Sequence, residues 1–137
     1  MFHAREIMNT DIVTVSPDDT IDQALSLMLQ YRITGLVVAD NDDHPLGIIS
    51  DFDLLEIAYD VNVEGHQVSD YMSSDLIQAD ETISWIEVAD ILKENRIRRL
   101  PITSEGKLVG IITRHDLMRA IRGVRLRARA LLVTSEN

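Results

Sequence analysis

The sequence predicts an α/β (α+β) fold in which two β-α-β-β-α repeats pack pseudo-symmetrically as one body. Two observations carry this prediction: the second half of the chain matches the first, and both halves hold short apolar strands and capped amphipathic helices in the same order. The 137 residues, 45% of them hydrophobic, suffice for one compact domain with a core. Half a chain of this length can seldom bury a sheet alone, so the halves are expected to pack face to face.

The repeat is visible at matched positions of the two halves. When the second half is laid over the first, Met72 falls on Met8. With one turn residue deleted from the second half, Gly110-Ile111-Ile112-Thr113 falls on Gly47-Ile48-Ile49-Ser50. A polar linker over residues 61–70 joins the halves. The predicted domains are repeat 1, residues 1–66, and repeat 2, residues 67–137, the latter with a basic C-terminal extension.

Each half is expected to open with a short strand and a capped helix. The strands are predicted at residues 12–15 and 76–79. Thr20 with Gln23, and Ser84 with Glu87, form S/T-x-x-E/Q capping boxes that satisfy free backbone N–H groups at a helix start. Apolar residues at i, i+3, i+4 and i+7 follow both boxes, so a helix of about 12 residues is predicted after each.

A hairpin and a second helix complete each half. The apolar runs 36–39 and 46–50, and likewise 100–103 and 108–112, are separated by turns too short for a helical crossover, so each pair is expected to be antiparallel. The second helices are predicted over residues 50–59 and 113–122, the latter ending before Gly123.

Composition and charge exclude several function classes. The absence of cysteine excludes disulfides, thiolate metal sites and cysteine nucleophiles. No apolar run approaches the roughly 18 residues of a membrane span and no secretory signal is visible at the N-terminus, so a cytoplasmic protein with no membrane partner is expected. The net charge of −10 is unevenly distributed, with −17 over residues 1–92 and +7 over residues 93–137. Any residues that bind an anion are therefore expected in the last third of the chain.

The two hairpins end in the same pattern, Gly47-Ile48-Ile49-Ser50-Asp51-Phe52-Asp53 and Gly110-Ile111-Ile112-Thr113-Arg114-His115-Asp116. A hydroxyl followed three residues later by a carboxylate is a helix-capping motif, and capping alone is one interpretation. The other is a nucleotide site. A helix N-terminus with a Ser or Thr hydroxyl can hold a phosphate, and a carboxylate one turn later can accept hydrogen bonds from both hydroxyls of a ribose.

The repeat, its element order and the two G-I-I-[ST]-x-x-D segments resemble a tandem pair of CBS domains, a Bateman module, over nearly the whole chain. Arg98-Arg99-Leu100-Pro101-Ile102 resembles the family's hydrophobic-proline stretch, whereas Gly35-Leu36-Val37 lacks the proline. The resemblance implies a stand-alone regulatory module that binds AMP, ADP, ATP or S-adenosylmethionine between the repeats. It further implies a disc-shaped homodimer, an unidentified regulated protein as partner, and no catalytic cofactor.

The resemblance also implies the roles of individual residues. The ribose-binding aspartates would be Asp53 and Asp116, the phosphate-side hydroxyls Ser50 and Thr113, the adenine contacts Ile48 and Ile111, and the apolar walls Leu36, Val37, Leu100 and Pro101.

The two predicted sites differ in charge. Asp51 follows Ser50 and would repel a phosphate, whereas Arg114 and His115 follow Thr113. Arg98 and Arg99 are expected within reach of Thr113 from the adjacent strand, and arginine forks suit phosphate oxygens. The second site is therefore predicted to bind the phosphate. The first is expected to be empty, weak, or filled by a ligand without phosphate.

The sequence leaves three interpretations of residues 124–137 open. Apolar residues alternate there with arginines, a period-2 pattern, although alanine, leucine and arginine are good helix formers. They could be a segment that docks a dimer partner against the acidic first repeat, a basic arm for nucleic acid, which the net charge disfavours, or a solvated tail. His3, His44 and His66 lack metal-ligand spacing, so no metal site is predicted.

The sequence favours one function class, leaves one alternative open and disfavours a third. An adenosine-ligand sensor is the leading hypothesis, because the motif occurs twice at matched positions. The alternative is an oligomerisation or partner-docking adaptor of the same fold, in which both S/T-x-x-D segments only cap helices. An enzyme is disfavoured, because no nucleophile with a base, no acid/base carboxylate pair and no metal cluster can be assembled from the sequence.

Overall fold

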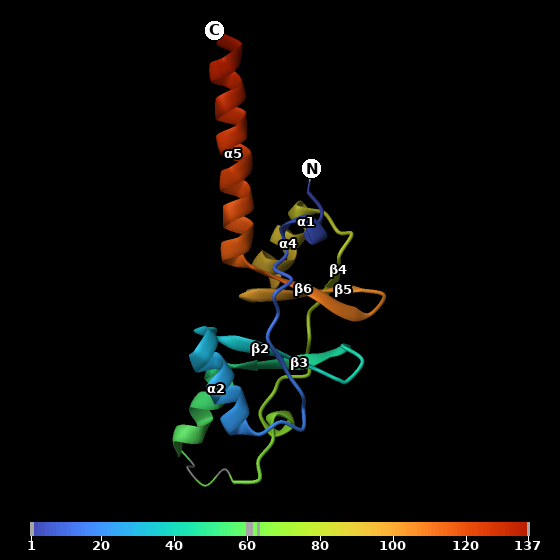
Figure 1. The fold of residues 1–137 in the computed structure, drawn as a ribbon, viewed down its shortest axis with the longest axis vertical. Helices are drawn as coiled ribbons and strands as arrows, with labels where there is room; N and C mark the ends of the chain where they lie inside the picture. The colour runs from blue at the N-terminus through green and yellow to red at the C-terminus, as the bar shows by residue number, and fades with distance from the viewer. Residues whose placement is uncertain (1, 60–61, 63, 137) are drawn as a thin grey trace.

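The computed structural model describes residues 2–59, 62 and 64–136, with side chains up to Leu132. Two three-stranded sheets lie one above the other, and helices cover their outer faces (Figure 1). Each sheet with its helices is one of the predicted repeats, and the two form one α/β body. The predicted fold class is therefore confirmed.

The first repeat holds one sheet of strand order β1-β2-β3. Its elements are β1 (Thr14–Val15), α2 (Ile21–Tyr31), β2 (Gly35–Ala39), β3 (Pro45–Ser50), α3 (Asp51–Leu55) and the 3-10 helix η1 (Glu56–Tyr59). Strand β1 pairs with β2 in parallel, and β2 pairs with β3 antiparallel. The predicted hairpin is confirmed, and the predicted second helix is an α-helical turn that continues as a 3-10 helix.

The second repeat repeats this arrangement. Its elements are the 3-10 helix η2 (Val68–Asp70), β4 (Ala79–Asp80), α4 (Trp85–Asn95), β5 (Arg99–Ser104), β6 (Lys107–Thr113) and α5 (Arg114–Glu136). Strand β4 pairs in parallel with β5, and β5 pairs antiparallel with β6. The strand predicted at 76–79 was misplaced: the observed strand is Ala79–Asp80, so of the predicted residues only Ala79 pairs with β5, and residues 76–77 line a cleft instead.

The helix starts form as the capping boxes predict. The Gln23 N–H donates to Thr20 Oγ1 over 3.2 Å, and the Thr20 N–H donates back to Gln23 Oε1 over 2.7 Å. In the second repeat, the Glu87 N–H donates to Ser84 Oγ over 3.2 Å. Each helix then buries its apolar stripe against the sheet of its own repeat.

The connecting segments cross between the repeats. Helix α1 (Ala4–Ile7) precedes the first repeat in sequence, yet Ala4 is fully buried in the second core. Val68 of η2 is fully buried in the first core. Along these crossings Asn9 pairs with Ile111 of β6, and Ser73 pairs with Ile48 of β3. Each repeat is therefore completed by a segment adjoining the other, which ties the two sheets into one body.

The predicted end of the last helix at Gly123 was wrong, because α5 runs without interruption from Arg114 to Glu136. Alanine, leucine and arginine dominate residues 124–132, and their helix propensity outweighs the cost of one glycine. Helix α5 projects away from both sheets, with the C-terminus at its far end (Figure 1).

Replacing Gly123 with alanine is expected to raise the free energy of unfolding by about 0.5–1 kcal/mol, since glycine loses more backbone freedom in a helix than alanine does. A Cβ at this position would meet no atom within 4 Å, so no clash opposes the gain. Urea denaturation followed by circular dichroism measures the change. A lower midpoint in the variant would contradict the helical assignment.

Among the described residues, no helix combines the length and the apolar content that crossing a membrane requires.

Candidate functional site

Two clefts lie between the repeats, and each takes residues from both. We call the cleft at Thr113 and Asp116 the second cleft. It has a volume of about 280 Å³. Its lining residues are Asn9, Asp11, Ile12, Val13, Arg32, Ile33, Thr34 and Gly35 from the first half, and Arg99, Ile111, Thr113 and Asp116 from the second.

The hydroxyl and the carboxylate of the second cleft are held by the start of α5. The Thr113 N–H donates to Asp116 Oδ2 over 2.9 Å, and the Asp116 N–H donates to Thr113 Oγ1 over 3.1 Å. Arg119 Nη2 approaches Asp116 Oδ1 at 3.4 Å. The Asp116 side chain keeps only 16% of its surface exposed. The S/T-x-x-D segment therefore caps the helix and at the same time presents its carboxylate to the cleft.

Arg99 supplies a cation to both clefts. Its Nη2 donates a hydrogen bond of 2.6 Å to Thr34 Oγ1, and among the described residues it forms no ion pair with a carboxylate. Burial, and then the charge of Arg98, lowers the pKa of Arg99, while Asp51 opposes the shift. An arginine keeps its charge in spite of such a shift, so this half-buried cation favours an anion beside it.

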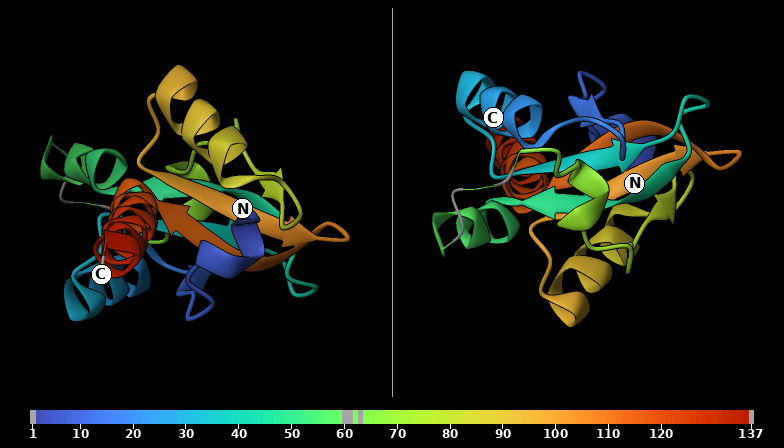
Figure 2. Two further views of the ribbon diagram at one scale, coloured as in Figure 1. Left: turned by 90° about the horizontal axis from the view of Figure 1, so that it is seen from above. Right: turned by 90° about the horizontal axis from the view of Figure 1, so that it is seen from below.

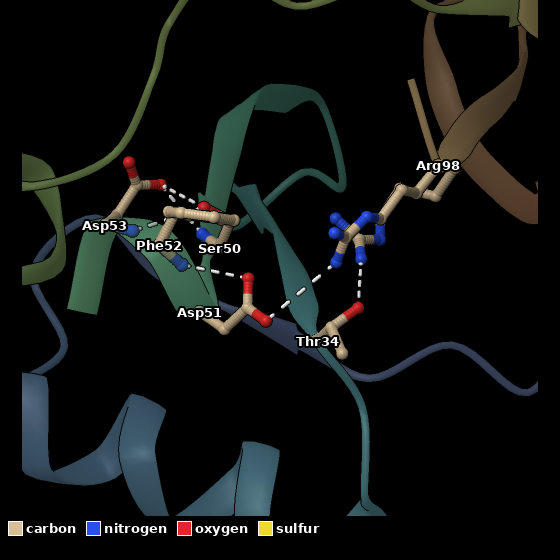
Figure 3. A network of polar contacts seen from close by, with 7 residues as sticks. Thr34, Ser50, Asp51, Phe52, Asp53 and Arg98 are labelled. Carbon is tan, nitrogen blue, oxygen red and sulfur yellow. Dashed lines mark hydrogen bonds and ion pairs between the residues drawn. The ribbon is translucent and has the colours of Figure 1, made fainter. Parts of the chain in front are cut away.

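The first cleft is the counterpart of the second cleft. It lies where β3 of the first repeat faces the start of β5 in the second repeat. It has a volume of about 250 Å³. It is lined by Ile48, Ser73, Asp75, Leu76, Ile77, Ile97, Arg98 and Arg99. Ser50 and Asp53 are absent from this lining. They cap α3: the Ser50 N–H donates to Asp53 Oδ2 over 2.8 Å, and the Asp53 N–H donates to Ser50 Oγ over 3.3 Å (Figure 3).

Arg98 belongs to the first cleft and not to the second. Its Nη1 lies 3.9 Å from Asp51 Oδ2, and the two side chains point toward one another from different repeats (Figure 3). The cause is the crosswise arrangement: the start of β5 faces the end of β3, just as the start of β2 faces the end of β6. Of the two arginines expected near Thr113, the structure brings only Arg99 to the second cleft, while Arg98 pairs with the acid expected to repel phosphate.

The four residues predicted as apolar walls lie outside both clefts. Leu36 and Leu100 are buried in the two cores. Val37 and Pro101 are fully buried too, but side chains alternate along a strand, so they point away from the cores toward the opposite sheet. The residues predicted as apolar walls are therefore interior packing, whereas Ile48 and Ile111, predicted as adenine contacts, line the first and the second cleft.

Arg114 and His115 are exposed on the first turn of α5 and do not line the second cleft. Its other cation is Arg32, which the sequence reasoning did not select. Arg32 ends α2 in the left-handed conformation (φ 54°), as Arg96 ends α4 (φ 53°). Arg32 and Arg96 occupy matched positions of the two repeats in the sequence, but only the fold shows that the end of α2 lies at the second cleft.

Three residues of metal-ligating types lie in the turn between β2 and β3, where the ligand atoms of Asp40, Asp42 and His44 lie within 4.8 Å of one another. Asp40 Oδ1 accepts backbone N–H bonds from Asp42 and His44, both over 2.9 Å. These hydrogen bonds lower the pKa of Asp40, that from His44 most strongly. Turn formation therefore accounts for this exposed cluster.

Comparison with known proteins identifies the family. The CBS domain model matches residues 4–60 and 68–123. The CBS domain-containing protein YhcV of Bacillus subtilis is 32% identical over 121 residues, which cover 85% of this chain and 84% of YhcV. Inosine-5'-monophosphate dehydrogenase of Methanocaldococcus jannaschii is 38% identical over 117 residues, but this chain spans only 23% of its length. Several curated relatives are thus considerably longer than this chain.

Solved structures share the architecture. The crystal structure of CBSX2 in complex with AMP has a TM-score of 0.83 at 28% identity, covering 91% of this chain and 99% of that one. A second structure of CBSX2, from Arabidopsis thaliana, also has a TM-score of 0.83 at 28% identity, covering 90% of this chain and 96% of that one. Since the family model covers both repeats and the fold agrees along their length, this chain belongs to the CBS-domain family as a tandem CBS pair.

Proposed function

We propose that this chain is a regulatory module that binds an adenosine-containing ligand in the second cleft. The observation that carries the proposal is that Thr113, Asp116 and the half-buried Arg99 line the same cleft between the repeats. A carboxylate accepts hydrogen bonds from two ribose hydroxyls, while the hydroxyl, the helix start and the guanidinium favour a phosphate. The AMP complex of CBSX2 supports adenosine as the ligand class.

The first cleft is proposed to be the weaker site. Asp51 already neutralises part of the charge of Arg98, one of the two arginines that line this cleft. A phosphate would have to compete with Asp51 for Arg98. A ligand without phosphate suits this cleft better.

The regulatory step is proposed to run through helix α5. Thr113 ends β6, and α5 begins at the next residue, so a ligand held by Thr113 and Asp116 acts directly on the helix start. A signal requires that the ligand bind two conformations with different affinity. The projecting helix is the element best placed to report such a shift.

Titration calorimetry with AMP, ADP, ATP and S-adenosylmethionine tests the proposal. We expect one dominant site per chain and a rise in melting temperature with the ligand that binds, because a ligand selective for the folded state stabilises it. Absence of both heat and thermal shift with all four ligands would refute it.

A partner-docking adaptor is the second candidate, and the observation that favours it is that both S/T-x-x-D segments form helix caps. In that case replacing Asp116 changes only stability. The two candidates are therefore separated by measuring affinity and stability on the same variant, as described in the Discussion.

A further inference from the structure

The two clefts share an arginine, because Arg99 lines both of them. Arg99 begins β5 and pairs with Thr113, just as Gly35 begins β2 and pairs with Ser50. The two positions are therefore equivalent in the two repeats. Seen from above and from below, the hairpin turns of both repeats lie on the same side of the molecule, so the starts of β2 and β5 lie together on the opposite side (Figure 2).

There is room for one side chain between these two strand starts. A Cβ added at Gly35 would overlap Nη1 and Cζ of Arg99, so the guanidinium fills the space that a side chain at position 35 would need. Two identical repeats would supply one arginine from each strand start, and thus one for each cleft. Because position 35 is a glycine, the two strand starts together supply one guanidinium to two clefts.

The guanidinium of Arg99 is held at the second cleft by a neutral group. Its Nη2 donates to Thr34 Oγ1 over 2.6 Å, and Thr34 lines the second cleft but not the first. On the side of the first cleft, Arg98 and Asp51 face each other over 3.9 Å (Figure 3). A hydrogen bond between an arginine and a phosphate is roughly twice as strong as one between neutral groups. A phosphate in either cleft can therefore take Arg99 over from Thr34.

We propose that Arg99 couples the two clefts, so that a phosphate-bearing ligand in one cleft weakens the binding of a second such ligand in the other. This inference rests on the proposed function, since it takes nucleotides as the ligands. An arginine fork binds the oxygens of one phosphate in bidentate geometry. Once a ligand in the second cleft has engaged Arg99, a phosphate in the first cleft is left with Arg98, which Asp51 already contacts.

The coupling distinguishes ligands by their charge. A nucleoside without phosphate does not engage Arg99, so its presence in one cleft leaves the other cleft unchanged. Thermodynamic linkage makes the effect reciprocal, because each ligand changes the affinity for the other by the same factor. The module therefore takes up a second nucleotide only at a higher concentration than the first, while it takes up a nucleoside independently.

Two matched fluorescent labels report the occupancy of each cleft in the full-length chain, which has no cysteine of its own. Thr10 and Ser74 are exposed and occupy equivalent positions of the two repeats. Each lies between two residues that line a cleft, the second cleft for Thr10 and the first cleft for Ser74. An environment-sensitive dye on Thr10→Cys or on Ser74→Cys is titrated with AMP. We call the AMP concentration at half of the fluorescence change the midpoint of that label.

The coupling is measured by emptying the second cleft. Arg32→Gln with Asp116→Asn removes a cation and a carboxylate that line the second cleft and not the first, and the label on Thr10→Cys verifies that this cleft no longer fills. The midpoint of the label on Ser74→Cys should then fall at least about fivefold, because Arg99 becomes available to the first cleft. With adenosine in place of AMP, its midpoint should change by less than about twofold.

The part played by Arg99 is tested in the chain with the emptied second cleft. Arg99→Gln removes the shared cation, so the midpoint of the label on Ser74→Cys should rise again to at least its wild-type value. Arg114→Gln removes the same charge from an exposed position that lines neither cleft, and this matched control should leave the midpoint within about twofold.

Three outcomes would count against these proposals, and they are distinguishable. If emptying the second cleft leaves the midpoint at Ser74→Cys unchanged, the clefts are independent and the coupling is refuted, while a response at Thr10→Cys still supports the second cleft as a nucleotide site. If emptying the second cleft lowers the midpoint equally in an Arg99→Gln chain, direct repulsion between two phosphates is the cause and Arg99 is not. If neither label responds to AMP, ADP or ATP and calorimetry detects no binding, the proposed function itself fails.

Discussion

Replacing Asp116 with asparagine is expected to weaken AMP binding about 10- to 100-fold while changing the free energy of unfolding by less than about 0.5 kcal/mol. The amide oxygen can still accept the Thr113 N–H, which the carboxylate accepts over 2.9 Å. The amide nitrogen cannot accept a ribose hydroxyl, so at least one hydrogen bond to a charged acceptor is lost. Such a bond contributes about 1.5–3 kcal/mol, and about 1.4 kcal/mol corresponds to tenfold in affinity.

Calorimetric titration gives the affinity, and urea denaturation of the same samples gives the stability. Asp53→Asn is the matched control, because Asp53 caps α3 as Asp116 caps α5 but does not line the first cleft. We expect it to leave the affinity of the dominant site within about twofold, which corresponds to less than about 0.5 kcal/mol. If Asp53→Asn abolishes binding and Asp116→Asn does not, the assignment of the two clefts is reversed. If neither changes affinity, the motif only caps helices.

Replacing Gly47 with alanine is expected to destabilise the fold by about 2 kcal/mol or more, because it combines overpacking with a disturbed backbone pairing. A Cβ at Gly47 would overlap the carbonyl oxygen of Ser73. The same backbone segment exchanges two hydrogen bonds with Ile48, over 2.9 and 2.8 Å. Overpacking costs typically about 1–3 kcal/mol, and a strained or broken backbone hydrogen bond adds about 0.5–1.5 kcal/mol.

The other motif glycine provides a graded comparison. A Cβ at Gly110 would overlap Sδ, Cγ and Cβ of Met8, of which Sδ and Cγ can leave by a change of rotamer, whereas the three nearest atoms at Gly47 all belong to the backbone of Ser73 and Ser74. Gly110→Ala should therefore cost less than Gly47→Ala in urea denaturation. Gly123→Ala is the control, because it removes the backbone freedom of a glycine without adding a clash. Equal stability of the Gly47 and Gly123 variants would show that the backbone at Ser73 does not require position 47 to lack a side chain.

Much of the fold was predictable because its signals are local. The capping boxes at Thr20 and Ser84 and the short hairpin turns each depend on residues within a few positions of one another. Because these local signals occur twice in the same order, they predict two equivalent units without any long-range contact. Strand 76–79 was misplaced because a two-residue strand is defined by its neighbour β5 and not by its own sequence.

The site was predictable only in part. Thr113, Asp116 and Ile111 line the second cleft together, as their positions in the motif imply. Arg98 lines the first cleft and not the predicted second one, because the start of β5 faces β3 of the other repeat. In the structure each cleft takes the end of one hairpin and the start of the other, so Arg32 and Thr34, far away in sequence, complete the second cleft.

The sequence by itself determined the two repeats, their helix starts, their antiparallel hairpins and the residues that follow each hairpin, because propensity, capping and periodicity act over a few residues. Only the tertiary structure decided which repeat each connecting segment completes, which arginine reaches which cleft, and that α5 continues through Gly123. These outcomes depend on packing between segments up to about half the chain apart. The basic last third of the −10 chain thus supplies Arg98 and Arg99 to the clefts between the repeats and places other arginines along α5.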